Sequence, residues 1–359
     1  MSGVATIGEI RARSVIVPLS RPLRTASGEL PAAPLLLLDV HTDTGVVGRA
    51  YLFGYAAEML APMVALVEQI APALAGKSVA PADRLRDFED RFRLLGLQGL
   101  LGMVLGGLDM ALWDALGQLL GQPVATLLGA EPVALRAYDS FGMVDPVKDE
   151  AALRESVASG FLGIKIKTGY PDATSDVAVV GGVREIIGPD VALMVDYNQS
   201  LDPAEASRRV ALLREFDLYW VEEPVAAEDL AGHAQVRRAT GARVQTGENW
   251  WFPRGAQAAI AAGACDFAML DLMKIGGVTG WARAAALAEG ASLPVSSHLF
   301  PEASAHVLAA TRNADWLEYL DLAGPVLADP PRPVDGHVTA VGPGLGMHWD
   351  SDAVARYRV

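Results

Sequence analysis

The chain has 359 residues, of which 51% are hydrophobic, and a formal net charge of −14. This length allows a barrel-sized domain together with a second, smaller domain. The strong negative charge argues against nucleic acid or an anionic membrane surface as a partner, because both are bound through basic patches. It does not exclude a small anionic substrate, since a metal ion and nearby lysines can outweigh the overall field.

The N-terminal residues lack the apolar core of a signal peptide. The apolar run at 97–108 is too short to span a bilayer and predicts a buried helix. Cys265 lies in an apolar run and is expected to be a small core residue. Together these features predict a cytoplasmic protein.

Residues 1–130 predict an α+β domain. Three apolar runs indicate strands of a small antiparallel sheet, at 13–19, 34–40 and 46–53. Helical patterns follow at about 56–75, 81–95 and 98–121. The last pattern is apolar nearly all round, so this helix is expected to be buried between two domains. The segment at 20–34 contains Pro and Gly and is predicted to be a lid loop beside a binding site.

From residue 131 onward, short strands and helices alternate. Eight strand ends can be marked, at Ser140, Lys165–Lys167, Asp196, Glu222, Glu248, Asp271, His298 and Glu318. Eight is the number of strands that closes a parallel barrel of the TIM type. The fold class is therefore predicted to be α/β, with a barrel at 131–323. A Pro- and Gly-rich tail at 324–359 is expected to pack back on the N-terminal domain.

Three acids follow one another at equal intervals of 26 residues: Asp196 in MVDYNQS, Glu222 in VEEP and Glu248 in TGENW. One strand, one helix and two loops take about this many residues, so each acid ends one βα unit. Each acid could instead cap the following helix, but capping does not require equal depth on three successive strands. Oxygen ligands alone favour a hard divalent cation, Mg²⁺ in the first place, with Mn²⁺ as a substitute.

The run GIKIKTG places Lys165 and Lys167 two residues apart, so both side chains face the barrel interior. Adjacent ammonium groups disfavour each other's charge. This predicts a lowered pKa for at least one of them, as a general base requires. The alternative is a fraying strand end with both lysines in solvent.

Other strand ends carry groups suited to proton transfer. Asp271 and His298 end neighbouring strands, and a carboxylate against one ring nitrogen would fix the tautomer and raise the basicity of the imidazole. Glu318 could donate a proton to a developing oxyanion if its pKa is raised. Asn198 shares a face with Asp196 and could bind a hydroxyl or carbonyl group. Each of these residues also has a purely structural interpretation, as a structural histidine, a surface carboxylate or a turn asparagine.

The series KIK, DYN, EEP, GEN, DLMKIGGVTGW, SSHLF and LEYLDLAG resembles the mandelate racemase subgroup of the enolase superfamily. The segments VPLSRPLRTASG and GRAYLFGY extend the resemblance into the N-terminal strands. The resemblance implies a modified (β/α)₇β barrel with an N-terminal α+β capping domain. It implies Mg²⁺ held by Asp196, Glu222 and Glu248, and a homo-oligomer such as an octamer.

The resemblance also implies the reaction, which is racemisation or epimerisation of a mandelate-like 2-hydroxy carboxylate through an enediolate. Lys167 would be the base on one face of the substrate, and His298, paired with Asp271, would serve the other face. The residues expected to contact the substrate carboxylate are Lys165, Glu318 and Ser140. Asn198 would contact the α-hydroxyl, and the pocket wall would contain Leu23, Ser27, Leu30 and Tyr55.

The lid segment departs from the racemase pattern. Ser27 stands where the racemase has an aliphatic residue, and Arg24 stands where it has histidine. Phe141 and Met143 also differ. A hydroxyl in an aryl-binding wall changes the fit by about 1–3 kcal/mol, which leaves the identity of the 2-hydroxy acid open.

Two other functions remain as alternatives. An acid-sugar dehydratase would use the same bases but needs a polar pocket, which Leu23, Leu30 and Phe300 disfavour. A non-catalytic structural relative would have no use for the bases Lys167 and His298.

Overall fold

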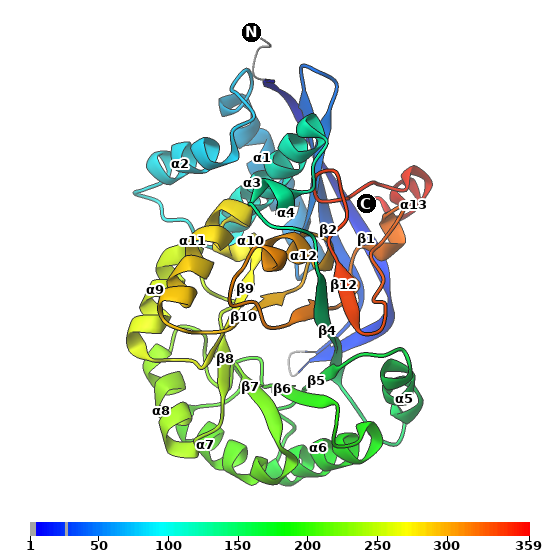
Figure 1. Ribbon diagram of the computed structural model, residues 1–359, viewed down its shortest axis with the longest axis vertical. Coiled ribbons are helices and arrows are strands. Elements are labelled where there is room, and N and C mark those ends of the chain that lie inside the picture. Colours follow the sequence, from blue (N-terminus) through cyan, green and yellow to red (C-terminus); the bar gives the residue numbers. More distant parts are fainter. Residues whose placement is uncertain (1–4, 26–27) are drawn as a thin grey trace.

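The N-terminal part of the chain forms an antiparallel sheet covered by helices. The computed structural model describes residues 5–25 and 28–359 (Figure 1). Strands β1 (Ile7–Thr25), β2 (Gly28–Thr42) and β3 (Val47–Phe53) lie in the order β1-β2-β3. The helices of this cap are η1 (Ala57–Met59), α1 (Leu60–Ile70), η2 (Ala71–Ala73), α2 (Pro81–Arg91), α3 (Gly99–Leu120) and α4 (Val124–Leu127). Val15 and Val17 of β1 are buried, and Leu35–Leu38 of the central strand β2 are fully buried in succession, so both faces of β2 are covered.

The barrel consists of eight parallel strands joined by helices. The strands are β4 (Ala134–Met143), β5 (Gly163–Lys167), β6 (Ala192–Asp196), β7 (Leu218–Glu222), β8 (Val244–Thr246), β9 (Phe267–Asp271), β10 (Val295–His298) and β11 (Leu317–Tyr319). They pair in the order β10-β9-β8-β7-β6-β5-β4-β11. The sheet closes between β10 and β11, where Ser297 N donates to Trp316 O at 3.0 Å. The predicted (β/α)₇β barrel is confirmed, because the last strand joins the first without a helix of its own.

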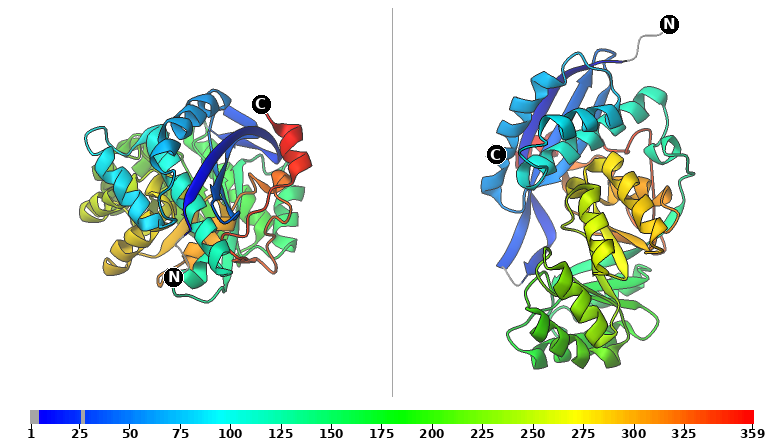
Figure 2. Two further views of the ribbon diagram at one scale, coloured as in Figure 1. Left: turned by 90° about the horizontal axis from the view of Figure 1, so that it is seen from above. Right: turned by 90° about the vertical axis from the view of Figure 1, so that its left-hand side faces the viewer.

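The barrel helices lie outside the strands (Figures 1 and 2). They are α5 (Glu150–Ala158), α6 (Ala173–Ile187), α7 (Pro203–Leu212), η3 (Arg214–Phe216), α8 (Leu230–Thr240), α9 (Phe252–Ala262), α10 (Leu272–Ile275), α11 (Gly277–Gly290) and α12 (Pro301–Ala309). Aspartates cap four of them, because the side chains of Asp172, Asp202, Asp229 and Asp271 accept backbone N–H groups in the first turns of α6, α7, α8 and α10.

Helix α3 joins the cap to the barrel, as its all-round apolar pattern predicts. It packs on β2 and β3 on one side and on α10 and α11 on the other. A Cβ at Gly106 would lie 2.3 Å from the carbonyl oxygen of Met273, so only glycine allows this approach to α10. By length and composition α3 is apolar enough to cross a membrane, but 78% of its most apolar window is buried inside the protein, which is typical of a core helix.

Residues 20–25 and 28–34 belong to β1 and β2 and form a β-hairpin, so the prediction of an irregular loop is wrong, whereas the role as a lid stays a prediction. Leu23 pairs with Leu30, and Arg24 pairs with Glu29 across the two strands. The register shifts between Pro18 and Leu23, which accommodates prolines that cannot donate to the ladder. The hairpin therefore extends from the cap toward the barrel strands β4 and β5 (Figure 1).

Residues 324–359 contact both the N-terminal cap and the barrel. After η4 (Gly324–Val326), strand β12 (His337–Thr339) pairs antiparallel with the first residues of β4. Helix α13 (Ser351–Tyr357) packs on β1, and the indole N–H of Trp349 donates to Asp39 of β2 at 2.8 Å. The domain boundaries at residues 130 and 323 stay a prediction.

A buried polar cluster links α3 to the barrel helix α11. The Asp109 carboxylate accepts the backbone N–H of Thr279 at 2.9 Å and its hydroxyl at 2.6 Å. The same hydroxyl accepts the indole N–H of Trp113 at 2.9 Å. Burial raises the pKa of Asp109 to about 7, although the hydrogen bonds from Thr279 oppose that rise.

We expect Thr279→Val to loosen this junction between cap and barrel. The substitution keeps the side-chain shape but leaves Asp109 and Trp113 each short of one partner in a buried site. The free energy of unfolding should fall by about 1–3 kcal/mol, measured by urea denaturation. Thr126→Val on the exposed face of α4 is the matched control and should change stability little. Equal stability of the two variants would show that the cluster contributes nothing.

Candidate active site

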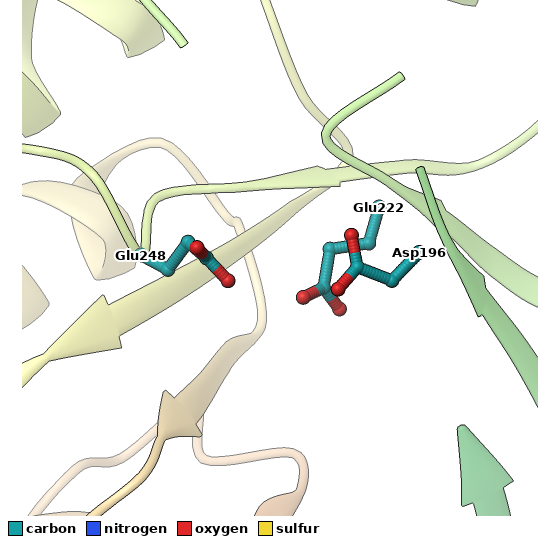
Figure 3. A group of neighbouring side chains, drawn as sticks. All are labelled: Asp196, Glu222 and Glu248. Atoms are coloured by element: carbon teal, nitrogen blue, oxygen red, sulfur yellow. The ribbon is translucent and has the colours of Figure 1, made fainter. Parts of the chain in front are cut away.

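Three carboxylates meet at the carboxyl ends of the barrel strands. Asp196 ends β6, Glu222 ends β7, and Glu248 lies two residues beyond β8. Their ligand atoms all lie within 4.8 Å of one another, and the Glu248 carboxylate faces the other two across a gap (Figure 3). They do not cap the following helices α7, α8 and α9, which begin at other N-cap residues. The equal spacing in the sequence therefore reflects convergence at one site.

This acidic cluster has the donor set of a hard divalent cation. Asp196 and Glu222 are fully buried, and Glu248 is 7% exposed. Burial, opposed by Lys165 and reinforced by Asp196 and Glu248, raises the pKa of Glu222 to about 8. Buried carboxylates that repel one another in this way need compensating charge. The three residues fit Mg²⁺, which prefers carboxylate oxygens.

The two lysines of β5 are both buried and both pair with the acids. Lys167 Nζ lies 2.7 Å from Asp196, and Lys165 Nζ lies 2.8 Å from both Glu222 and Glu318. Burial opposes both ammonium charges, but the neighbouring carboxylates outweigh it, so the pKa of each lysine is raised. The prediction of a lowered pKa is wrong for this arrangement, because sequence spacing showed the second lysine but not the facing acids.

The pair formed by Asp271 and His298 is present as predicted. Asp271 ends β9 and His298 ends β10, and the imidazole Nδ1 lies 2.6 Å from the carboxylate. The Asp271 carboxylate accepts a hydrogen bond from Nδ1–H, and Nε2 lies 3.3 Å from Glu248. Burial opposes the imidazolium charge, but Glu248 and Asp271 favour it, and the pKa of His298 is raised.

Glu318 lies beside these groups, but its carboxylate is held in the ionised form. It accepts the backbone N–H of Leu299 at 2.8 Å and pairs with Lys165. Burial favours the neutral acid, but Lys165 and His298 outweigh it and lower the pKa of Glu318 to about 2. This is opposite to the raised pKa that a proton donor needs, and the cause is again a partner distant in the sequence.

Asn198 and Ser140 also face the site. The Asn198 amide donates to Asp196 at 2.9 Å, and its backbone, at a φ of 43°, turns the side chain toward the acids. Its buried carbonyl oxygen has no hydrogen-bond partner among the described residues. That oxygen is therefore available to accept a ligand hydroxyl. Ser140, near the end of β4, is buried and lines the same cavity.

The catalytic candidates open into a cavity of 430 Å³. Lys165, Lys167, Asn198, Glu248, His298 and Glu318 line it together with the apolar residues Leu23, Leu30, Phe53, Tyr55, Leu299 and Leu320. The predicted wall residues Leu23, Leu30 and Tyr55 are thus in place, and Ser27 lies outside the described residues. Phe300 does not reach the cavity, because it is fully buried against Tyr51, with ring centroids 5.1 Å apart.

Several cavity residues were not singled out from the sequence. They include Thr25, Gly28 and Glu29 of the hairpin, and Gln199, Asn249 and Lys274 of the barrel. Asn249 directly follows Glu248, and Lys274 lies three residues after Asp271 in the motif DLMKIGG. Both residues lie within three positions of a strand-end acid, and this proximity is the sequence signal that predicts their place in the cavity.

The hairpin is fastened to the first barrel strand. Arg21 donates twice to the buried Asp139, at 2.5 and 3.1 Å, and its guanidinium lies 3.8 Å from the ring centre of Phe141. A Cβ at Gly142 would lie 2.5 Å from the backbone nitrogen of Arg24, so glycine allows the hairpin to lie directly on β4. Phe141 therefore supports the hairpin anchor.

Comparisons with known proteins agree with this architecture. Residues 7–129 match the mandelate racemase / muconate lactonizing enzyme N-terminal domain, and residues 148–353 match the enolase C-terminal domain-like family. A crystal structure of an enolase from Bradyrhizobium, complexed with magnesium and mandelic acid, has a TM-score of 0.98 and 54% sequence identity, covering 100% of both chains.

Relatives with assigned activities are more distant. The D-galactarolactone cycloisomerase of Agrobacterium fabrum is 31% identical over 95% of this chain and 96% of its own length. The L-talarate/galactarate dehydratase of Salmonella typhimurium is 31% identical over 68% of this chain, and the match spans 62% of that enzyme, less than two thirds of its length. The chain therefore belongs to the enolase superfamily, and within it to the mandelate racemase / muconate lactonizing enzyme family.

We expect Arg21→Met to loosen the hairpin over the cavity. Loss of both hydrogen bonds to Asp139 leaves a buried carboxylate unpaired, which favours the open hairpin. Tryptic cleavage after Arg24 should accelerate by about tenfold, which corresponds to about 1.4 kcal/mol in the opening equilibrium. Arg11→Met, which breaks an exposed ion pair with Glu9 on the same strand, is the control. Similar cleavage rates for both variants would contradict the anchoring role.

Proposed function

We propose that this protein is a Mg²⁺-dependent racemase of an apolar or aromatic 2-hydroxy carboxylate. The observation that carries the proposal is the placement of Lys167 and His298 on separate strands of the barrel, both facing one cavity beside the acidic cluster. Strands β4 and β11 separate them on one side of the barrel, and β6–β9 separate them on the other. Two bases that approach an α-carbon from different sides permit proton removal on one face and return on the other.

Asp196, Glu222 and Glu248 would hold the cation. When bound, Mg²⁺ would polarise the substrate carboxylate and offset the carboxylate charge that raises the pKa of Lys167. Lys167 would then remove the α-proton from one face. The Lys165 ammonium would stabilise the charge that develops on the substrate carboxylate. On the other face, His298 Nε2 would deliver or remove the proton, with Asp271 holding the imidazole in the required tautomer.

The cavity walls support an apolar substrate side chain. Leu23 and Leu30 of the hairpin and Phe53 of β3 contribute apolar side chains to the cavity lining. The carbonyl oxygen of Asn198 supports recognition of a 2-hydroxyl group, since it is buried and lacks a partner among the described residues. The bound mandelic acid in the Bradyrhizobium enolase is consistent with a substrate of this type.

An acid-sugar dehydratase is the second candidate. The same proton abstraction would then be followed by loss of a β-hydroxyl group. Glu29, Thr25 and Gln199 favour it, because they add polar groups to the cavity wall. The similarity to the L-talarate/galactarate dehydratase also supports this candidate. A screen of 2-hydroxy acids and acid sugars, followed by polarimetry and by detection of 2-oxo products, separates the two reactions.

Removal of the metal or of one ligand should abolish activity. EDTA-treated protein is expected to be inactive and to recover on addition of Mg²⁺. Glu222→Gln should weaken Mg²⁺ binding by more than about 100-fold, since even the loss of an outer-shell partner costs 10–100-fold. Isothermal titration calorimetry measures the Mg²⁺ affinity. Glu185→Gln on the surface of α6 is the control and should bind Mg²⁺ like the parent protein. Full activity of metal-free protein would rule out the proposed metal dependence.

The two bases should be separable by isotope exchange. His298→Asn removes the titrating group on one face, so racemisation should fall by about 10²–10⁴-fold. In D₂O this variant should still exchange the α-proton of one enantiomer through Lys167, and by the family resemblance this is the (S) form. Lys167→Met should exchange only the other enantiomer, through His298. Asp271→Asn should behave like His298→Asn, because the imidazole loses the partner that sets its basicity.

Proton NMR of each enantiomer, incubated separately with each variant, provides the measurement. His337→Asn on β12 is the matched control, since that histidine does not line the cavity. Racemisation by His298→Asn at nearly the parent rate would remove the two-base mechanism. Release of a 2-oxo product from an acid sugar would favour the dehydratase.

A further inference from the structure

A third lysine lines the cavity in addition to Lys165 and Lys167. Lys274 lies in the one-turn helix α10, and the residue is 5% exposed. Its backbone N–H donates to Asp271 at 2.9 Å, which fixes the start of the helix. Its ammonium lies 4.9 Å from the ring centre of Tyr55 in the cap. The racemase mechanism described above assigns this buried charge no role.

The Lys274 ammonium contacts an asparagine next to a proposed metal ligand. Lys274 Nζ donates to the side-chain oxygen of Asn249 at 2.5 Å. The Asn249 amide nitrogen donates to Glu223 at 2.8 Å and to Glu248 at 3.1 Å. One amide therefore bridges two carboxylates, and its oxygen faces the lysine.

The chemistry of the groups dictates this orientation. An ammonium group only donates hydrogen bonds, and an ionised carboxylate only accepts them. If the amide of Asn249 rotated by half a turn, its oxygen would face Glu223 and Glu248, and its nitrogen would face Lys274. The amide oxygen would then repel the two carboxylates, and the amide N–H groups would repel the ammonium group of Lys274. Lys274 thus selects the rotamer in which Asn249 can hold Glu248.

Glu223 is the second carboxylate that the Asn249 amide contacts, beside Glu248. Its side chain is buried, and one of its carboxylate oxygens has no hydrogen-bond partner among the described residues. The contact with Asn249 ties Glu223 and Glu248 together, so the amide limits how far Glu248 can move.

We propose that Lys274 is a positioning residue that locks the Asn249 amide and thereby holds Glu248 in its metal-binding orientation. This inference rests on the proposed Mg²⁺ site. Lys274 favours Mg²⁺ binding through its contact with Asn249, whereas its positive charge disfavours Mg²⁺ binding. A cation beside a dication repels it, so the charge alone weakens Mg²⁺ binding, whereas the positioning contact strengthens it.

The two effects have opposite signs, which makes a direct test available. Mg²⁺ affinity is measured by isothermal titration calorimetry without any substrate. Lys274→Met keeps the length of the side chain and removes the donor. If Lys274 acts by positioning, Mg²⁺ binding should weaken by about 10–100-fold, as for other outer-shell partners. If only its charge matters, binding should tighten.

Further variants test the route through the amide. Asn249→Leu keeps Lys274 but removes the bridge, and should weaken binding to the same extent as Lys274→Met. The double variant should be no weaker than either single variant, because both changes break one connection. Lys274→Arg retains a donor and should recover most of the affinity. Lys77→Met, at an ion pair with Asp87 in the cap, is the matched control and should bind Mg²⁺ like the parent.

The outcomes separate the inference from the function on which it rests. Failure of the parent protein to bind Mg²⁺ overturns the proposed metal site itself. Parent-like or tighter binding by Lys274→Met, with the parent binding normally, overturns the positioning role alone. Additive losses in the double variant also overturn it. Thermal unfolding of each variant shows that a weaker binder is still folded, and Asn249→Leu provides a second test if Lys274→Met does not fold.

Discussion

The mutual repulsion of three buried carboxylates is the constraint on which the site depends. Asp196, Glu222 and Glu248 come from neighbouring strand ends and cannot all be ionised at such close range without cations. Lys165 and Lys167 supply two of these positive charges from the adjacent strand β5. The neighbouring carboxylates raise the pKa values of both lysines against the effect of burial. Burial raises the pKa of Glu222, and Asp196 and Glu248 add to this rise.

The cap completes a site that the barrel alone leaves open. Helix α3 supports the short helix α10 through the close approach at Gly106, and α10 carries Lys274 and begins at Asp271. The hairpin of β1 and β2 forms the apolar wall and is tied to the barrel through Arg21 and Asp139. Proton-transfer groups and cavity wall thus come from separate parts of the chain.

The strand ends could be predicted from the sequence because each acid follows an apolar run at one βα interval. The same periodicity indicated the barrel, and the all-round apolar pattern indicated the burial of α3. The hairpin could not be predicted, because prolines and glycines predict loops and its strand pairing depends on contacts with the barrel. The pKa of Glu318 depends on Lys165, which is far away in the sequence. Likewise, the Asn249 bridge depends on a side-chain rotamer that no spacing reveals, and Phe300 turns away from the cavity at a positive φ of 50°.

The location of the hairpin on β4 has a consequence for the evolution of this protein. The anchor at Arg21 lies at the base of the hairpin, whereas Leu23, Glu29 and Leu30 lie nearer its tip. At the tip it is the backbone of Arg24 that lies against Gly142 of β4. Substitutions at the tip alter the shape and polarity of the wall without displacing any strand end. Ligand preference can therefore drift through a few positions of the wall while the reactive groups stay under unchanged selection. Divergence among relatives of this chain should accordingly concentrate in the hairpin tip.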